Sequence, residues 1–546
     1  MADPTPAGSS RHYATVWEAI ADRLPDQTAL RHGDHEVTWA AFDDRSARLA
    51  AALADRGLGE GAGFAAYLYN CPEYLEIFFA ALKVRAVPSN VNYRYGSDEL
   101  LALLESSHAR VLFFDAELRH HVASIVDRAP SITFVEVGSS DASAPIPGAL
   151  TYEDLIAEAA PAPRIERADT DTWLSYTGGT TGLPKGVVFD IGQSFGNSLR
   201  FRDLFLGSTT DLDPVEFAVH LAELGTPLSG IPASPLMHST GFFYAALPTL
   251  VAGGTVTTLP GRGFDAVELL DTIESCRASV VAIVGDAFGL PIARALEAGR
   301  PDGSAYDVGS LRTICSAGVA WTAPIKERML EHLPGVTLVD SCGSTEGVAY
   351  GFKQVRTGDA LVTANFMAAA GLKVLGEDGE ELPVGAVGVL AGPTTATGYL
   401  GDPERTALTF RMIDGVQHAV PGDLGRIEAD GSLTLIGRGV TTINTGGEKV
   451  YPGEVEDAIR ELTAVDDCLV LGVPDERFGQ AVAALVVPRP DAVVAVDDVR
   501  GAVRRSLAGY KVPRHLRFVD AVPRLPNGKI DYEAATLAVT TTAVER

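Results

Sequence analysis

The chain has 546 residues, too many for one compact hydrophobic core, so two or more domains are expected. Hydrophobic residues make up 46% and charged residues 21%, which are ordinary values for a globular protein and exclude a disordered chain. The 71 acidic residues outnumber the 44 basic ones and give a formal net charge of −27. Such a charge repels phosphate backbones and anionic headgroups, which argues against a nucleic-acid partner or a membrane-surface role.

The cysteines and the apolar segments indicate the compartment. The five cysteines are widely spaced and form no C-x-x-C pair, which favours reduced thiols over a disulfide framework or a zinc site. The N-terminal segment lacks the apolar stretch of a secretory signal. The longest apolar stretch, 278–296, is interrupted by Asp286 and Pro291. We therefore expect a cytoplasmic protein without membrane insertion.

Helix-like and strand-like patterns alternate along the first 430 or so residues, which predicts an α/β fold of mainly parallel sheets covered by helices. The expected helices are 16–24, 45–56, 99–106, 266–276 and 325–333. The expected strands are 63–68, 110–114, 255–259 and 279–284. A charged connection, 161–171, leads into the apolar run 173–176. From about 371 to 436, short strands with Gly- and Pro-rich turns predict a β-rich subdomain.

A separate module is expected after residue 436. Pro452 suits the first turn of a helix with Val455, Ile459 and Leu462 on one face. Strands are expected at 467–472 and 481–487, and a second helix at 499–507. About 110 residues suffice for a small α+β domain. The predicted domains are therefore 1–436 and 437–546.

The most informative segment is the string 176–186, Tyr-Thr-Gly-Gly-Thr-Thr-Gly-Leu-Pro-Lys-Gly. Its glycines let backbone amides approach a polyphosphate, its threonines add hydroxyl groups, and Lys185 adds positive charge. It is not a Walker A loop, because it lacks Gly-Lys-Ser/Thr, and Pro184 before a strand-like run argues against a helix there. A hairpin loop without a ligand is the alternative interpretation.

This string resembles the phosphate-loop signature of the adenylate-forming superfamily, which contains acyl-CoA synthetases, luciferases and peptide-synthetase adenylation domains. The segment 88–100 matches upstream, and further matches follow in the family's order: PLMHSTG (235–241), SAG (316–318), GSTE (343–346), GDL (422–424), GR (437–438) and PNGKID (526–531). An ordered set is far more specific than any single motif. The resemblance covers nearly the whole chain and is closest to bacterial ligases for fatty acids and steroid side-chain acids.

The resemblance implies an enzyme that uses ATP and Mg²⁺ to convert a small-molecule carboxylic acid, fatty or otherwise hydrophobic, to acyl-AMP and pyrophosphate, and then CoA to form the thioester. The implied catalytic residues are Lys529, Thr345, Glu346 and His238, with Glu346 as the Mg²⁺ ligand. The implied ATP- and AMP-binding residues are Thr177, Gly178, Gly179, Thr180, Thr181, Gly182, Lys185, Ser316, Ala317, Gly318, Asp340, Ser341, Cys342, Gly343, Ser344, Asp423 and Arg438. The implied acyl pocket contains His238, Val284, Gly285 and Asp286, and the implied CoA tunnel Gly446, Gly447 and Lys449.

The residue types suit this chemistry. Attack of a carboxylate on the α-phosphate brings two anions together, and Lys529 can bridge them. Mg²⁺ takes one or two carboxylates plus phosphate oxygens, which suits Glu346. The two oxygens of Asp423 suit two ribose hydroxyls. Alone, these residues would be read as a surface lysine, a capping glutamate and a turn aspartate. An unpaired Asp286 in an apolar pocket is costly, so a structural hydrogen-bonded role is favoured for it.

Two positions depart from the family pattern. Cys342 stands where the family usually stacks an aromatic residue on adenine, and Val440 stands where the hinge usually has Asp or Lys. Neither residue performs chemistry in the family, so the prediction of adenylation stands. The two departures concern nucleotide affinity and domain rotation, so thioester formation is less well supported than adenylation. The alternatives are adenylation with a carrier-protein or amine acceptor, adenylation of a small oxyanion, and a catalytically silent acyl or nucleotide sensor. The resemblance also implies a mobile C-terminal domain and allows a homodimer.

Overall fold

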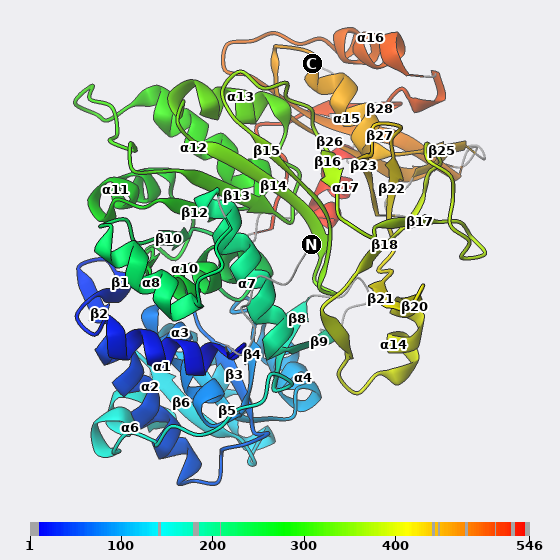
Figure 1. Ribbon diagram of the computed structural model, residues 1–546. Coiled ribbons are helices and arrows are strands. Elements are labelled where there is room, and N and C mark those ends of the chain that lie inside the picture. The colour runs from blue at the N-terminus through cyan, green and yellow to red at the C-terminus, as the bar shows by residue number, and fades with distance from the viewer. Residues whose placement is uncertain are drawn as a thin grey trace.

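The computed structural model describes residues 10–139, 144–177, 185–207, 209–438, 443–445, 448–475, 479–507, 509–525 and 530–540. Within these residues the strands form three sheets, with helices between and around them (Figure 1). The α/β class predicted from the alternating pattern is confirmed.

The largest sheet joins a parallel half to an antiparallel half. In spatial order its strands are β2 (His35–Thr38), β1 (Thr28–His32), β11 (Thr255–Thr258), β10 (Ser229–Pro232), β12 (Val280–Ile283), β13 (Thr313–Ala317), β14 (Thr337–Ser344), β15 (Val348–Val355), β16 (Asn365–Ala368), β23 (Ser432–Arg438), β22 (Asp423–Ile427), β18 (Gly388–Pro393), β21 (Val416–Ala419) and β20 (Phe410–Ile413), with β17 (Lys373–Leu375) beside β18. The pairs from β1 to β14 are parallel, and those from β14 to β20 are antiparallel. The antiparallel part thus begins at β15, before the start at about residue 371 that was predicted for the β-rich subdomain.

The second sheet carries both ends of the glycine-rich string. Its order is β19 (Ala396–Tyr399), β9 (Lys185–Asp190), β8 (Thr172–Thr177), β4 (Val87–Asn90), β3 (Gly63–Tyr67), β5 (Ala109–Asp115), β6 (Thr133–Val137) and β7 (Leu150–Thr151). The chain continues after Pro184 as strand β9, as predicted. Strand β19 comes from much later in the chain and pairs with β9 in antiparallel fashion.

Helices fill the space between these two sheets and cover their outer faces. The helices that share the central core are α1 (Tyr13–Arg23), α2 (Trp39–Ala54), α3 (Pro72–Lys83), α6 (Tyr152–Glu158), α7 (Ile191–Leu206) and α10 (Leu247–Val251). The helices packed on the outer face of the largest sheet are α11 (Ala266–Cys276), α12 (Gly285–Ala298) and α13 (Ala323–His332). Those packed on the outer face of the second sheet are α4 (Ser97–Ser106) and α5 (Arg119–Ala123). The remaining helices of this region are α8 (Pro214–Glu223), α9 (Ser239–Gly241) and α14 (Pro403–Thr409).

Strand β3 is buried along its whole length because both of its faces are covered. Phe64 and Ala66 point into the central core, whereas Ala65 and Tyr67 point into the core under α4 and α5. Side chains alternate between the two faces of a strand, and parallel strands are usually covered on both faces. A continuous apolar run is the expected result.

The last part of the chain builds a third sheet with its own two cores. Its strands are β25 (Glu448–Val450), β24 (Ile443–Thr445), β27 (Gly479–Pro488), β26 (Val465–Asp475) and β28 (His515–Phe518). Helices α15 (Pro452–Arg460) and α16 (Val496–Ser506) pack on one face, and α17 (Tyr532–Thr540) packs on the other. We call this unit, residues 443–540, the small domain; it lies at one end of the molecule (Figure 1). No helix among the described residues is both long and apolar enough to cross a bilayer.

The helix boundaries agree only partly with those predicted from local sequence patterns. Helix α15 begins at Pro452 and buries Val455 and Ile459, as predicted, but it ends at Arg460, so Leu462 lies beyond it. Helix α2 begins at Trp39, six residues before its predicted start at 45. The reason is a cap: the Thr38 hydroxyl accepts a hydrogen bond from the Ala41 backbone N–H at 3.2 Å, which stabilises an earlier helix start.

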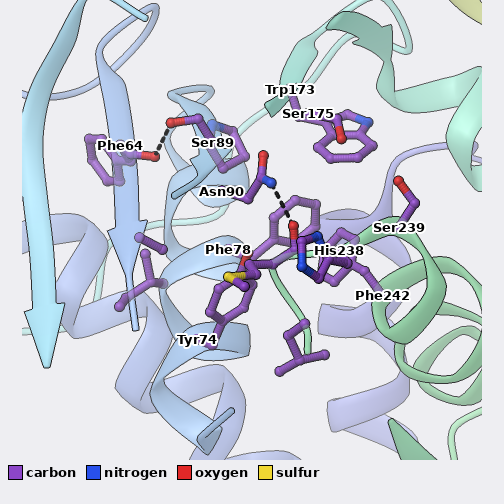
Figure 2. A pocket seen from close by; sticks show the side chains of 15 residues that line it. Phe64, Tyr74, Phe78, Ser89, Asn90, Trp173, Ser175, His238, Ser239 and Phe242 are labelled. Carbon is purple, nitrogen blue, oxygen red and sulfur yellow. Dashed lines mark hydrogen bonds between the residues drawn. The ribbon is translucent and has the colours of Figure 1, made fainter. Parts of the chain in front are cut away.

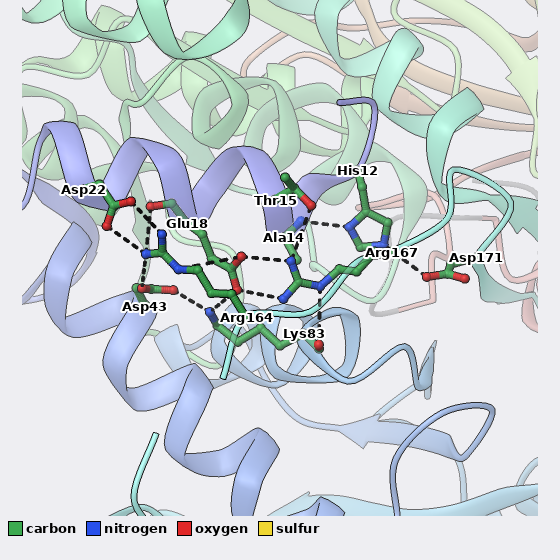
Figure 3. Close-up of polar contacts among 10 residues, drawn as sticks. All are labelled: His12, Ala14, Thr15, Glu18, Asp22, Asp43, Lys83, Arg164, Arg167 and Asp171. Atoms are coloured by element: carbon green, nitrogen blue, oxygen red, sulfur yellow. Dashed lines mark hydrogen bonds and ion pairs between the residues drawn. The ribbon is translucent and has the colours of Figure 1, made fainter. Parts of the chain in front are cut away.

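The charged connection between α6 and β8 is fixed by buried ion pairs (Figure 3). Arg167 forms two hydrogen bonds with the Glu18 carboxylate, at 2.9 and 2.8 Å, and the Lys83 ammonium lies 2.9 Å from the same carboxylate. Farther along, Asp171 binds Arg85 at 2.8 Å. Buried charges are stable only when paired, so this network holds the start of β8 against α1 and α3.

The Asp466 carboxylate of the small domain contacts both α12 and α13. The Asp466 side chain is only 4% exposed and forms ion pairs with Arg294 of α12 and with Arg328 of α13, the latter at 3.4 Å between Nη1 and Oδ1. Arg328 also binds Glu297 at 2.7 Å. A single acidic residue of the small domain is therefore held by two arginines of the large one.

Candidate functional site

The glycine-rich string connects two paired strands of the second sheet. Strands β8 and β9 are antiparallel, and Thr177 and Lys185 are the last Cα partners before the connection. The ends of the predicted phosphate loop are therefore neighbours. The described residues stop on either side of the predicted loop residues Gly178, Gly179, Thr180, Thr181 and Gly182.

Asn90, the last residue of β4, joins the start of this loop to the His238 segment. Its Nδ2 donates to the carbonyl oxygens of Tyr176 at 3.0 Å and Met237 at 2.5 Å, and its Oδ1 accepts from the Tyr176 N–H at 2.6 Å. An amide with three hydrogen bonds has a defined orientation. The two segments that the motif order assigns to phosphate and acid are thus adjacent at the carboxyl ends of parallel strands, where α/β folds bind ligands.

Glu346 lies with Thr345 in the turn between β14 and β15. The Tyr399 hydroxyl donates to its Oε1 at 2.7 Å, and the Thr394 hydroxyl donates to its carbonyl oxygen at 2.5 Å. The Lys185 Nζ lies 5.9 Å from the centroid of the Tyr399 ring. Lys185 and Glu346, far apart in sequence, therefore lie near the ring and the hydroxyl of one tyrosine.

Asp423 begins β22 and is buried beside Tyr350 of β15. The Tyr350 hydroxyl donates to Asp423 Oδ2 at 2.8 Å, and burial together with this carboxylate raises the pKa of Tyr350. Asp423 and Arg438 are Cα partners in the β22–β23 ladder. Cys342 of β14 is the Cα partner of Gly351 in β15, the residue that follows Tyr350. The predicted ribose and adenine positions thus converge.

Two further predicted nucleotide-site residues on β14 bind protein partners. Asp340 pairs with the Lys326 ammonium of α13 at 2.5 Å, and both side chains are buried. Burial raises the pKa of Asp340, and Lys326 opposes that shift. On the other face of the strand, the Ser341 hydroxyl lies 3.0 Å from the Tyr244 hydroxyl. The remaining predicted positions at the end of this strand are Gly343 and Ser344.

The segments at 284–286 and 316–318 meet at the start of α12. The Gly285 N–H donates to the Ser316 hydroxyl at 2.8 Å, and the Asp286 carboxylate accepts from the Thr322 N–H at 2.8 Å. Burial raises the pKa of Asp286 to about 6, and Arg460 of the small domain is the largest opposing influence. The hydrogen-bonded role expected for Asp286 agrees with this geometry. Val284, Ala317 and Gly318 flank the same contact.

A cavity lies beside His238, between the second sheet and α3 (Figure 2). Aromatic and aliphatic side chains form most of its wall. The lining residues are Phe64, Ala66, Tyr74, Ile77, Phe78, Pro88, Ser89, Asn90, Trp173, Ser175, Leu236, Met237, His238, Ser239 and Phe242. Val284, Gly285 and Asp286, which the sequence groups with His238, are not among them. A short π-helical turn, Phe242–Ala246, follows His238, a form often found at functional sites.

The predicted site residues of the small domain and hinge are mostly outside the described residues. Lys449 belongs to β25, with its backbone paired to Asn444 of β24. The residues on which the structure gives no description are Val440, Gly446, Gly447 and Lys529.

The described side chains suit a metal ion that takes most of its ligands from a bound nucleotide and water. Among the residues that the structure describes, no group of three or more His, Cys, Asp or Glu side chains could hold a metal ion. Glu346 offers one oriented carboxylate. Mg²⁺ binds by one or two carboxylates, with phosphates and water completing its octahedron, so Glu346 fits a Mg²⁺ ion that arrives with a nucleotide.

Four side chains that contact the predicted site were not identified from the sequence. Tyr399, Tyr350, Asn90 and Lys326 each bind a predicted site residue or segment through an uncharged hydroxyl, an amide or a buried ammonium group. Tyr399 lies within the Thr-Gly-Tyr-Leu stretch, and Asn90 within the segment 88–100. Neither the position of Tyr399 nor that of Asn90 in the sequence indicates which residue it contacts.

Comparison with known proteins identifies the family of the chain. Residues 17–400 match the AMP-binding enzyme family, and residues 454–529 match the AMP-binding enzyme C-terminal domain. The chain therefore belongs to the AMP-binding enzyme family, and its resemblance to adenylate-forming enzymes is confirmed.

Similar proteins cover nearly the full length of the chain. A 3-oxocholest-4-en-26-oate–CoA ligase from Rhodococcus rhodochrous is 36% identical over 538 residues, covering 96% of this chain and 95% of that protein. The medium-chain acyl-CoA ligase Mig from Mycobacterium avium is 35% identical, covering 98% and 99%. The crystal structure of ATP-bound MatB from Rhodopseudomonas palustris superposes with a TM-score of 0.76 at 26% identity, covering 95% and 98%.

Proposed function

We propose that this protein activates a hydrophobic carboxylic acid with ATP and transfers the acyl group to CoA. It is an AMP-forming acid–thiol ligase. The acid carboxylate attacks the α-phosphorus of ATP, pyrophosphate leaves and acyl-AMP forms. The CoA sulfur then attacks the acyl carbon, AMP leaves with the bonding electrons, and the thiol proton passes to solvent.

One observation carries this proposal: the Tyr399 hydroxyl holds Glu346 at 2.7 Å while its ring faces Lys185 at 5.9 Å. The end of the phosphate loop and the candidate Mg²⁺ ligand are thereby neighbours, although they come from different sheets. A cation and an oriented carboxylate at one polyphosphate site are what phosphoryl chemistry needs.

The remaining roles are assigned by the motif order. Residues 178–182 and Lys185 bind the phosphates, and Glu346 holds Mg²⁺ with Thr345 beside the α-phosphate. Mg²⁺ bound there would neutralise phosphate charge. Asp423 and Arg438 bind the ribose, and the turns at 316–318 and 340–344 enclose adenine. His238 forms the wall between nucleotide and acid, and Lys529 bridges the carboxylate and the α-phosphate.

The acid is proposed to be hydrophobic on two grounds. Relatives of full length are named as ligases of a steroid side-chain acid and of medium-chain acyl groups. The cavity wall beside His238 is mostly aromatic and aliphatic and includes Phe78, Trp173 and Phe242. The cavity volume is about 20 Å³, room for about one water molecule, so its wall indicates apolar surroundings beside His238 and says nothing of the length of the acyl chain.

The proposal also covers domain organisation and setting. A large domain of 1–436, with the β-rich part at about 371–436, would carry the nucleotide site. A mobile domain, 437–546, would bring Lys529 for adenylation and Gly446, Gly447 and Lys449 for CoA. A cytoplasmic location is supported by five cysteines without disulfides. A homodimer is proposed from the resemblance alone, and sedimentation velocity tests it.

The decisive experiment is pyrophosphate release across aliphatic, aromatic and steroid side-chain acids, with and without CoA. We expect acid-dependent release with medium- or long-chain and steroid acids, and thioester only when CoA is present. Pyrophosphate release that no acid stimulates, or ADP as product, contradicts the proposal. Accumulation of acyl-AMP that CoA does not discharge indicates a carrier-protein or amine acceptor.

A further inference from the structure

Tyr399 lies where the two larger sheets approach the candidate nucleotide site. It ends β19, and its Cα partner is Val187 of β9, two residues after Lys185. The next residue, Leu400, donates its N–H to the Gly186 carbonyl oxygen at 2.8 Å. Tyr399 is thus fixed to the strand that leaves the phosphate loop, while its hydroxyl reaches the β14–β15 turn of the other sheet.

The tyrosine side chain has little freedom. It is 9% exposed, and its ring packs edge-on against Phe410 with the centroids 5.3 Å apart. Its backbone N–H donates to the Thr406 hydroxyl at 2.9 Å. A tyrosine hydroxyl is protonated at neutral pH and an ionised carboxylate can only accept, so Tyr399 is the donor to Glu346.

Glu346 is consequently held at two points. Its carbonyl oxygen accepts from Thr394 at 2.5 Å, and its Oε1 accepts from Tyr399 at 2.7 Å. Among the described residues, nothing donates a hydrogen bond to Oε2. One carboxylate oxygen is used for orientation, and the other is available to a ligand.

We propose that Tyr399 is a positioning residue that couples the phosphate loop to the metal-binding carboxylate. Its hydroxyl orients Glu346 toward a divalent cation bound with the nucleotide, and its ring provides an electron-rich face near the Lys185 ammonium. The inference rests on the proposed function. It adds a residue to that site to which the motif order gives no role.

The test is a metal titration that does not depend on turnover. Mn²⁺ binding to the full-length protein is measured by electron paramagnetic resonance, with a non-hydrolysable ATP analogue at saturation. Tyr399→Phe removes only the hydroxyl and keeps the ring near Lys185. Loss of a hydrogen bond that orients a metal ligand typically weakens metal affinity about 10- to 100-fold, and we expect a change of about tenfold here. The Mg²⁺ concentration for half-maximal pyrophosphate release should rise in parallel, and excess Mg²⁺ should restore much of the rate.

Tyr350→Phe is the matched control, because it removes the same group from the other candidate carboxylate, Asp423. It should weaken binding of the ATP analogue and leave Mn²⁺ affinity at saturating analogue unchanged. Melting temperatures of both variants exclude misfolding as the cause. In the double variant Tyr399→Phe/Glu346→Gln, removal of the hydroxyl should have no further effect on Mn²⁺ affinity.

Three results would overturn the inference. Tyr399→Phe could bind Mn²⁺ as tightly as the wild type, the two substitutions could act additively, or the wild-type nucleotide complex could bind no Mn²⁺. The first two results leave the proposed reaction standing if the wild type still releases pyrophosphate in response to acid. If the wild type releases no pyrophosphate in response to any acid but Tyr399→Phe binds Mn²⁺ about tenfold more weakly, the proposed reaction is contradicted and the role of Tyr399 is retained.

Discussion

Two tyrosine hydroxyls donate to two carboxylates on neighbouring parts of the same site, Tyr399 to Glu346 and Tyr350 to Asp423. A neutral donor fixes the orientation of a carboxylate without cancelling its charge, so the second oxygen still attracts a cation or a hydroxyl. Asp340 differs because Lys326 neutralises it. We therefore expect Asp340 to shape β14, and Glu346 and Asp423 to contact ligands.

Replacement of Asp423 tests this distinction. Asp423→Asn keeps the side-chain size but removes the charge and replaces one acceptor with a donor, so one ribose hydroxyl loses its partner. Hydrogen bonds to charged groups contribute about 1.5–3 kcal/mol, which predicts a roughly 10- to 100-fold weaker affinity for an ATP analogue. Isothermal titration calorimetry measures this. An unchanged affinity in a folded variant would assign Asp423 to the protein interior alone.

His12 provides a pH-dependent prediction. Its Nε2 lies 3.5 Å from Asp171 (Figure 3), yet its pKa is lowered to about 4, first by burial and next by Arg167. The carboxylates of Asp171 and Glu18 raise the pKa, but they do not offset burial and Arg167, and Arg85 lowers it further. Between about pH 6.5 and pH 4 the unfolded chain binds a proton that the folded protein does not. Stability from this group is therefore present above that range and is lost as pH falls to about 4, by up to about 3 kcal/mol.

His12→Asn should remove this dependence. The His12 ring accepts the Ala14 N–H at 3.3 Å at the start of α1, and asparagine is an equally good cap. The variant should lose less melting temperature than the wild type between about pH 7 and about pH 4. Parallel losses in both proteins would mean that other groups dominate acid unfolding.

At the scale of single elements, the turn from β12 into α12 depends on close contact between backbones. Gly285 has φ +46°, and a Cβ there would lie 2.4 Å from the Ala320 carbonyl oxygen. The turn carries the hydrogen bond to Ser316 and begins the helix that contains Asp286. A side chain at this position would separate two segments that the motif order assigns to one site.

Gly285→Ala should therefore destabilise the fold more than a glycine-to-alanine substitution at an uncrowded position with positive φ. A left-handed conformation costs a non-glycine residue about 1–2 kcal/mol, and overpacking adds about 1–3 kcal/mol. Gly401→Ala is the control, because Gly401 has φ +69° but a Cβ there would have no heavy atom of another residue within 4 Å. Gly285→Ala should have a lower melting temperature than Gly401→Ala. Pyrophosphate release stimulated by the carboxylic acid substrate should fall only in Gly285→Ala. Equal effects would show that the neighbouring loop adjusts freely.

At the scale of the whole molecule, the contact between the small domain and α12 and α13 depends on the Asp466 cluster. If the small domain rotates between half-reactions, this cluster must break. Asp466→Asn weakens the orientation seen here and should change the ratio of the two half-reaction rates by up to about fivefold, equivalent to about 1 kcal/mol. Acyl-AMP formation and its discharge by CoA are measured separately.

The matched control is Asp520→Asn, an exposed acidic residue of the small domain. It should leave the ratio unchanged. Higher salt should reduce the difference between Asp466→Asn and the wild type, because it screens ion pairs. A ratio that is the same for both variants would indicate that this contact does not limit rotation.

The α/β class, most element positions, the family and the order of its motifs can be predicted from the sequence. These depend on local information: apolar periodicity, prolines and glycines at turns, and contiguous strings such as 176–186. The hairpin β8–β9 and the helix from Pro452 follow from neighbouring residues alone.

The side chains that orient the candidate site residues become apparent only in the folded chain. Tyr399 and Glu346 are 53 residues apart, Tyr350 and Asp423 are 73 apart, and Asn90 and Tyr176 are 86 apart. Their contacts depend on strand order and register, which place β19 beside β9 and β22 near β15. A hydroxyl or amide group carries no mark of its distant partner in the sequence, because many residues of the same type could serve until the sheets assemble.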